Sequence, residues 1–289
     1  MKFFTDDYFH IGKAHLGSGK PCQDYAISGS DDFAFAVVSD GCSSGGNTDV
    51  GSRLLALATA SAIKENWTLN NVIDKDASVV QLEMQQRFIL AGLQNTLNLN
   101  VHDMLATCIY AYICPNGGFV RICGDGTIAL KYRSGKIVMH NFEWHNNTPY
   151  YPVYKNGFLK QFIDTHGGNL DNICVSEEIW IIDDKESFSS NVKEYSLWEG
   201  IEGIDISIDK QILDELEFIA IFSDGVTQIE GVAWHDAVED FLSFKNTTGA
   251  FAKRRMIRGL KNMDKLGKDP MDDISYAVIG IGLEEVETK

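Results

Sequence analysis

The chain reads Phe33-Ala34-Phe35-Ala36-Val37-Val38-Ser39-Asp40-Gly41 near its start, an apolar run that stops abruptly at an aspartate and a glycine. The run is too short and too β-branched near its end for a helix, and the alternation of Phe with Ala suits a strand whose two faces pack differently. Gly41 has no Cβ, so the backbone can turn sharply and its carbonyl can point beside the Asp40 carboxylate. Two hard oxygen atoms on adjacent residues suggest a divalent cation.

The same arrangement of an aspartate at the end of an apolar strand recurs along the chain. Asp125 follows the run 119–123, and Asp224 follows the run 216–222. The order is reversed at Asp272, which precedes the run 274–281, and at Asp24, which precedes another expected strand. A single Asp-Gly pair is also the commonest way to make a turn, so one occurrence proves little. Five carboxylates at strand ends predict one shared site.

Length and composition limit the class of protein. A chain of 289 residues with 44% hydrophobic content can bury a full core, and no Pro/Ser/Gly-rich segment marks a linker. We therefore expect a single domain over 1–289, with a variable, loop-rich segment at about 143–210. No stretch resembles a signal peptide or a membrane span, which predicts a soluble, cytoplasmic protein without a membrane partner. The net charge of −16 argues against a nucleic-acid partner.

The cysteines predict no disulfide framework. They are irregularly spaced and mostly lie in apolar runs, so reduced core thiols are expected. The sequence contains no CxxC pair and no Cys/His cluster, so a zinc site is not expected. The six positions are Cys22, Cys42, Cys108, Cys114, Cys123 and Cys174.

Periodicity predicts the remaining elements. Helices are expected at 50–66, from a cap at Ser78 onward, at 233–244 and at 249–266, and strands at 8–13, 104–114, 118–123, 127–132, 136–142 and 274–281. On the second helix Val80, Met84 and Phe88 fall four apart, which is typical of core residues, and Leu82, Ile89 and Leu93 broaden the apolar face. The four middle strands predict an antiparallel meander with Asp125 at the bend between two of them. This pattern favours an α+β fold: two antiparallel β-sheets packed face to face, with helices on the outer faces (an α/β/β/α sandwich).

Two further features allow more than one interpretation. The run 179–182 ends in Asp183-Asp184, a competing carboxylate pair that ranks lower because no glycine follows. The helix expected at 249–266 carries a basic face, for which a solvated surface is the default and a docking surface for a phosphorylated or acidic partner is the alternative. The basic residues are Lys253, Arg254, Arg255, Arg258, Lys261 and Lys265.

The chemistry follows from the carboxylates. Five aspartates within a few ångströms could not all stay ionised, because like charges raise one another's pKa, so cations must neutralise them. Oxygen ligands without His or Cys select Mg²⁺ or Mn²⁺. Two such ions about 3.5–4 Å apart can hold a hydroxide and stabilise a phosphoryl group during in-line attack. The expected reaction is direct hydrolysis of a phosphate ester, without a covalent intermediate, since neither a CxxxxxR loop nor a Ser-His arrangement is present.

A candidate phosphate contact lies in the loop expected at 15–21, which leads directly to Asp24. His15 and Lys20 could meet a phosphate there, although an exposed loop with no such role is the alternative for either residue.

These residues resemble the metal-dependent type 2C Ser/Thr protein phosphatase (PPM) family, in a bacterial-type branch. The resemblance covers nearly the whole chain, with the motifs in the family's order. Each motif is weak alone, but five in order are specific. They are Gln23-Asp24 for the family's Glu-Asp, Val38-Ser39-Asp40-Gly41 for its first Asp-Gly, Gly124-Asp125-Gly126 for its Gly-Asp-Ser, Ser223-Asp224-Gly225 for its second Asp-Gly, and Asp272-Asp273-Ile274-Ser275 for its Asp-Asn-x-Thr.

The resemblance implies a role for each motif residue. Asp40 would bridge two Mn²⁺ or Mg²⁺ ions, and the Gly41 carbonyl would bind one of them. Asp224 and Asp272 would complete the shell of the other ion, so that Asp40, Asp224 and Asp272 form the catalytic set. Asp24 would act through a water, and Asp125 would share Asp224 to hold a third, weaker ion.

Three positions depart from the family pattern. Gly19 stands where the family often has a phosphate-binding arginine, and His15 and Lys20 are the candidates to substitute for it. Cys42 stands where a histidine often serves as the proposed general acid. Gln23 replaces the usual glutamate and removes one negative charge.

The leading hypothesis from sequence is a phosphatase that hydrolyses phosphoserine and phosphothreonine in proteins in a signalling setting, where a Ser/Thr kinase or its targets would be the partners. One alternative is a catalytically silent binding module with the same fold. The other is a hydrolase of small phosphorylated metabolites.

Overall fold

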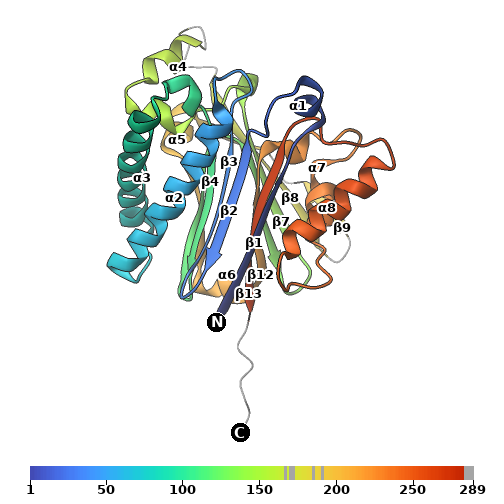
Figure 1. Ribbon diagram of the computed structural model, residues 1–289. Helices are drawn as coiled ribbons and strands as arrows, with labels where there is room; N and C mark the ends of the chain where they lie inside the picture. Colours follow the sequence, from blue (N-terminus) through green and yellow to red (C-terminus); the bar gives the residue numbers. More distant parts are fainter. Residues whose placement is uncertain (166–167, 169–172, 184–185, 190–191, 283–289) are drawn as a thin grey trace.

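Two antiparallel β-sheets lie face to face in the computed structural model, with helices on both outer faces (Figure 1). The structure describes residues 1–165, 168, 173–183, 186–189 and 192–282. The predicted α/β/β/α sandwich is confirmed. No helix in these described ranges is both long and apolar enough to cross a membrane.

The first sheet has five strands and the second has eight. In spatial order the first consists of β11 (Ile204–Asp209), β5 (Gly117–Cys123), β4 (Cys108–Cys114), β3 (Ala34–Asp40) and β2 (Asp24–Ser30). The second consists of β1 (Lys2–His10), β13 (Ile274–Gly282), β12 (Leu216–Phe222), β6 (Gly126–Tyr132), β7 (Ile137–Trp144), β8 (Cys174–Asp183) and β10 (Lys193–Ser196), and β9 (Glu186–Ser189) also pairs with β8.

Long helices cover each sheet. The five-stranded sheet carries α2 (Thr48–Asn70) and α3 (Lys75–Leu97), and the eight-stranded sheet carries α7 (Trp234–Phe241) and α8 (Phe251–Asp264) (Figure 1). Short helices fill the connections: α1 (Lys13–Ser18), α4 (Leu159–Thr165), α5 (Leu197–Glu202) and α6 (Lys210–Glu215). The predicted helices at 233–244 and 249–266 are confirmed within a few residues at each end.

Strand β3 shows why this sandwich has several apolar layers. Ala34, Ala36 and Val38 pack into the core between the two sheets. Phe35 and Val37 point the other way and pack against the helical layer. Successive side chains of a strand alternate between its faces, so small residues fit the sheet-to-sheet interface while Phe fills the space beneath the helices.

The predicted core face of the second long helix is partly wrong. Val80, Met84 and Phe88 are 61%, 62% and 83% exposed, whereas Leu82, also expected in the core, is buried, as is Leu90. The buried face also contains the polar side chain of Gln86, which an analysis of apolar residues does not identify. The helix begins earlier than predicted, at the cap Asp74, whose carboxylate accepts a hydrogen bond from the Ala77 amide.

The predicted meander is confirmed as two antiparallel hairpins, β4–β5 and β6–β7, but not as one sheet, because β5 and β6 belong to different sheets. The chain crosses between the sheets at Gly124-Asp125-Gly126, where both glycines have positive φ angles of 110° and 133°. These left-handed conformations favour glycine and allow the abrupt change of direction. The indole Nε1 of Trp144 donates a hydrogen bond to the Gly124 carbonyl at 2.9 Å and fixes this crossing.

The N-terminal prediction also needs correction. The first strand runs over Lys2–His10 rather than 8–13, and part of the predicted loop forms α1, which ends at Gly19 with φ 71°. Asp183 ends β8, as predicted, and Asp184 lies outside the described residues. All six cysteines are free, and three of them, Cys108, Cys114 and Cys123, are buried.

Candidate metal centre

Asp24 and Asp40 face each other at one end of the five-stranded sheet. They are directly paired in the β2–β3 register, since Asp24 begins β2 and Asp40 ends β3. Asp24 is 1% exposed, and its Oδ2 accepts a hydrogen bond of 2.6 Å from the Ser223 hydroxyl. Ser223 follows β12, so this hydrogen bond connects the ends of the two sheets.

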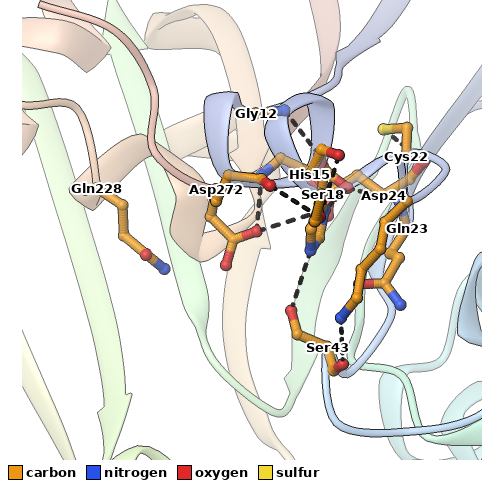
Figure 2. Close-up of polar contacts among 12 residues, drawn as sticks. Gly12, His15, Ser18, Cys22, Gln23, Asp24, Ser43, Gln228 and Asp272 are labelled. Carbon is orange, nitrogen blue, oxygen red and sulfur yellow. Dashed lines mark hydrogen bonds and ion pairs between the residues drawn. The ribbon is translucent and has the colours of Figure 1, made fainter.

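Asp224 and Asp272 lie at the facing end of the eight-stranded sheet. Asp224 begins the 3₁₀ helix Asp224–Thr227 after β12, and Asp272 lies two residues before the neighbouring strand β13. The Gln228 amide donates a hydrogen bond of 2.8 Å to Asp224 Oδ2. Gln228 lies on the side of Asp272 away from His15 (Figure 2).

The five sequence-predicted aspartates interact electrostatically. Burial raises the pKa of Asp24 to about 7, and burial together with the charge of Asp272 raises the pKa of Asp224 to about 6. Burial raises the pKa of Asp40 far above its usual range, and the charges of Asp24 and Asp224 add to the effect. Asp125 is raised in the same way by burial and by Asp224. Each of the five carboxylates therefore lies close enough to at least one of the others for their charges to interact.

The chemistry of this cluster fits divalent cations. The Oδ1 atom of Asp24 is buried and has no hydrogen-bond partner among the described residues, an arrangement that costs free energy unless a positive group meets it. The five aspartates offer only carboxylate oxygens, which suit Mg²⁺ or Mn²⁺ better than softer metals, and the one neighbouring nitrogen donor in the described part of the chain that groups with them is His15, beside Asp272 and Asp273.

Two glycines allow the backbone to pack closely around the cluster. A Cβ on Gly41 would lie 2.6 Å from the Thr48 carbonyl oxygen, and one on Gly225 would lie 1.9 Å from the Asp273 carbonyl oxygen. The Gly41 amide also donates a 3.1 Å hydrogen bond to the Gln23 carbonyl. The glycine after each of these aspartates is therefore required by space, whichever ligands its carbonyl meets.

Asp273, which the sequence analysis did not single out, organises one side of the site. Its carboxylate accepts hydrogen bonds from the backbone amides of Gly12 (2.7 Å) and Gln23 (2.6 Å). His15 Nδ1 lies 2.8 Å from Asp273 Oδ2 and 3.9 Å from Asp272 Oδ1. One buried carboxylate thus joins α1, β2 and β13, and the tandem Asp272-Asp273 was its only sequence signal.

The two proposed phosphate contacts occupy different environments. His15 is buried beside Asp272, and its Nε2 lies 3.4 Å from the Ser43 hydroxyl (Figure 2). Lys20 is exposed, and its ammonium donates a hydrogen bond of 2.9 Å to the Ser43 carbonyl. Both side chains therefore meet the segment that follows Asp40-Gly41.

A polar cleft of about 470 Å³ opens beside Asp125 and Asp224. It contains another carboxylate, Glu143, whose charge raises the pKa of both aspartates. The Asn141 amide holds Glu143 with a 3.0 Å hydrogen bond. Sequence reasoning missed Glu143 because it lies inside β7 with no Asp-Gly signal. The remaining residues of the cleft include Phe142, Trp144, His145, Ser176, Thr227 and Gln228.

Tyr151 was also missed. It is buried beside Cys42, and burial followed by the charge of Cys42 raises its pKa far above the usual range. Asp125 and Asp40 contribute to the same shift, so the phenol lies near both carboxylates. Tyr151 belongs to the weakly periodic segment at 143–210, where the sequence offers no local signal for such a contact.

Residues 11–263 match the model of the protein phosphatase 2C family, and the chain belongs to that family. Among solved structures, the chain is similar to the serine/threonine phosphatase Stp1 from Staphylococcus aureus, with a TM-score of 0.54, 13% identity and coverage of 98% of this chain and 96% of that one. It is also similar to the serine/threonine phosphatase PstP/Ppp of Mycobacterium tuberculosis, with a TM-score of 0.51, 12% identity and coverage of 98% and 100%. No curated protein matches the sequence significantly.

Proposed function

We propose that this chain is a Mn²⁺- or Mg²⁺-dependent phosphatase that hydrolyses phosphoserine and phosphothreonine in proteins. The observation that carries the proposal is the convergence of five repelling carboxylates from both sheets, one of them with a buried, unpartnered oxygen. Membership of the protein phosphatase 2C family supports the same reaction.

In this proposal Asp24, Asp40, Asp224 and Asp272 would hold the two principal ions, since the charges of Asp24 and Asp224 both act on Asp40 and that of Asp272 acts on Asp224. Asp125 and Asp224 would hold a third, weaker ion. When bound, the ions would activate water at neutral pH and neutralise charge on the phosphoryl group.

The protein's own side chains would orient these ligands. Ser223 fixes the Asp24 carboxylate, and Gln228 fixes that of Asp224, so neither has to reorganise when substrate binds. The Tyr151 hydroxyl is protonated at neutral pH and can donate a hydrogen bond beside Cys42, but its raised pKa makes it a poor proton donor. It would therefore orient a bound group and not replace the histidine that often serves as the family's proposed general acid.

The polar cleft supports a phosphorylated protein segment as substrate, because about 470 Å³ beside Asp125 and Asp224 leaves space for a phosphorylated side chain. Lys20, which is exposed and bonded to the Ser43 carbonyl, would offer positive charge to the phosphate. Phosphorylated targets of a Ser/Thr kinase are the partners that this chemistry fits.

The test is hydrolysis of a phosphothreonine peptide and of p-nitrophenyl phosphate by the full chain, with Mn²⁺, with Mg²⁺ and with EDTA. We expect peptide turnover that EDTA abolishes and Mn²⁺ restores, and its loss in Asp40→Asn. Asp183→Asn is the matched control, because Asp183 also ends a strand but is exposed and remote from the cluster in the chain's pairing pattern.

The other outcomes identify the alternatives. Absence of turnover of either substrate by folded, Mn²⁺-loaded protein would refute the proposal and favour a catalytically silent binding module. Turnover of small phosphate esters without the peptide would favour a metabolite hydrolase. Full activity in Asp40→Asn would refute the assigned role of the carboxylates.

A further inference from the structure

A second group of metal-binding side chains lies on the outer part of the eight-stranded sheet. It consists of His145, Cys174 and Glu194, whose ligand atoms all lie within 4.8 Å of one another. The Cys174 Sγ lies 3.2 Å from both ring nitrogens of His145, so either nitrogen can meet a shared ion after rotation of this exposed ring. The sequence predicted no Cys/His cluster, because these residues are far apart along the chain.

Strand pairing explains why the three side chains meet. His145 directly follows β7, Cys174 begins β8, and Glu194 lies in β10 on the other side of β8. Trp144 pairs with Val175, and both are buried in the core between the sheets. The alternation of a strand therefore turns the neighbouring His145 and Cys174 to the opposite face.

Glu194 reaches the same face from β10. It pairs with Ser176, while Cys174 pairs with Ser196, so Glu194 and Cys174 are diagonal neighbours across the strands. Within the described residues no lysine, arginine or histidine forms an ion pair with Glu194. Its carboxylate is thus available to a cation.

We propose that His145, Cys174 and Glu194 bind a Zn²⁺ ion. Thiolate, imidazole and carboxylate are the three donors that Zn²⁺ takes in proteins, and three protein ligands leave a fourth position of the tetrahedron open. The thiolate gives this site a different metal preference from the aspartate cluster, because Mg²⁺ and Mn²⁺ prefer oxygen ligands. The inference does not depend on the proposed phosphatase activity.

The proposed zinc site lies next to the polar cleft. His145 also lines the polar cleft that contains Asp125 and Asp224. A Zn²⁺ ion here would add positive charge to the rim of that cleft, and its open position would be accessible from the solvent, since His145 and Glu194 are exposed.

The test uses Co²⁺ as a spectroscopic probe for Zn²⁺, added to the full-length, reduced, metal-free protein. We expect a thiolate-to-cobalt charge-transfer band and intense tetrahedral d–d bands that saturate at one equivalent. Zn²⁺ should bleach them, and excess Mg²⁺ should not. The same bands should appear in Asp40→Asn, in which the aspartate cluster is disrupted.

Variants then assign the ligands. Cys174→Ser should remove the charge-transfer band, whereas Cys22→Ser, which changes another partly exposed thiol, should keep it. Glu194→Gln should weaken Zn²⁺ binding by more than the roughly 10–100-fold typical of losing a hydrogen-bond partner of a metal ligand. Absence of the band in the wild type, or its persistence in Cys174→Ser, would overturn the proposal.

A second measurement does not depend on how well the variants fold. Zn²⁺ should slow alkylation of Cys174 in the wild-type protein, measured by mass spectrometry of the modified peptides, and should leave the alkylation rate of Cys22 unchanged. Equal rates at Cys174 with and without Zn²⁺ would refute the site.

Discussion

Replacing Asp24 by Asn should stabilise the metal-free protein, although Asp24 belongs to the proposed metal centre. Asp24 is buried, and its pKa is raised from 3.8 to about 7. At pH 8 the folded chain carries this charge at a cost of about 1.4 kcal/mol for each unit of pKa shift, or on the order of 4 kcal/mol. Asn removes the charge, and its side-chain oxygen can still accept the hydrogen bond from Ser223.

The assay is urea unfolding at pH 8, followed by tryptophan fluorescence, in EDTA and in saturating Mn²⁺. We expect the free energy of unfolding of Asp24→Asn to exceed that of the wild type in EDTA, with a smaller gain on adding Mn²⁺. Asp183→Asn, at the exposed end of β8, should change neither quantity. A metal-free Asp24→Asn protein less stable than the wild type would refute the argument that burying the Asp24 charge destabilises the metal-free fold.

Three further outcomes follow from the same structure. The pKa values of Asp24 (about 7) and Asp224 (about 6) are raised, so between about pH 4 and pH 7 the metal-free folded state binds more protons than the unfolded state. The free energy of unfolding in EDTA should therefore fall as the pH rises from about 4 to 7. Saturating Mn²⁺ should abolish this fall in the same unfolding experiments. Gly225→Ala should cost about 1–3 kcal/mol or more in urea unfolding, because its Cβ would overlap the Asp273 carbonyl, and an unchanged midpoint would contradict this close packing. Phe88→Ser should change stability by less than about 0.5 kcal/mol, whereas Leu82→Ala should cost about 2–5 kcal/mol; the reverse order would show that the exposed and buried faces of α3 are misassigned.

The sequence predicts the strands that carry the aspartates, because each combines a short apolar run with an adjacent polar end. Asp40 ends β3, Asp224 follows β12, and Asp24 begins β2, as their local patterns indicate. Those patterns involve neighbouring residues only, so they can be recognised without knowing how the strands pair in the sheets. That these side chains bind metal stays a prediction.

Other features depend on contacts between distant residues and could not be predicted from sequence. The run from β5 to β6 reads as a hairpin, yet the positive φ angles around Asp125 carry the chain into the other sheet. The second long helix carries apolar residues on more than one face, and its inward face includes Gln86, which donates a 2.6 Å hydrogen bond to the Thr59 hydroxyl. Polar pairs of this kind make a buried face look like a solvated one.

The roles of Glu143 and Tyr151 show the same limitation for the site. Both residues come from the weakly periodic segment at 143–210. Their proximity to the aspartates depends on tertiary packing between residues far apart in the sequence. His145 and Cys174 meet for a similar reason, because pairing of β7 with β8 aligns residues that the sequence separates. Pairing between strands must be known before such neighbours can be identified.

The aspartate cluster lies where the two sheets meet. Asp24 and Asp40 belong to the five-stranded sheet, Asp224 and Asp272 flank strands of the eight-stranded sheet, and the Ser223–Asp24 hydrogen bond joins the two. Any displacement of one sheet relative to the other would therefore alter the spacing between the two carboxylate pairs, even if every strand kept its shape. Ions held by both pairs would oppose such a displacement, so metal binding and the mutual alignment of the sheets are expected to be coupled.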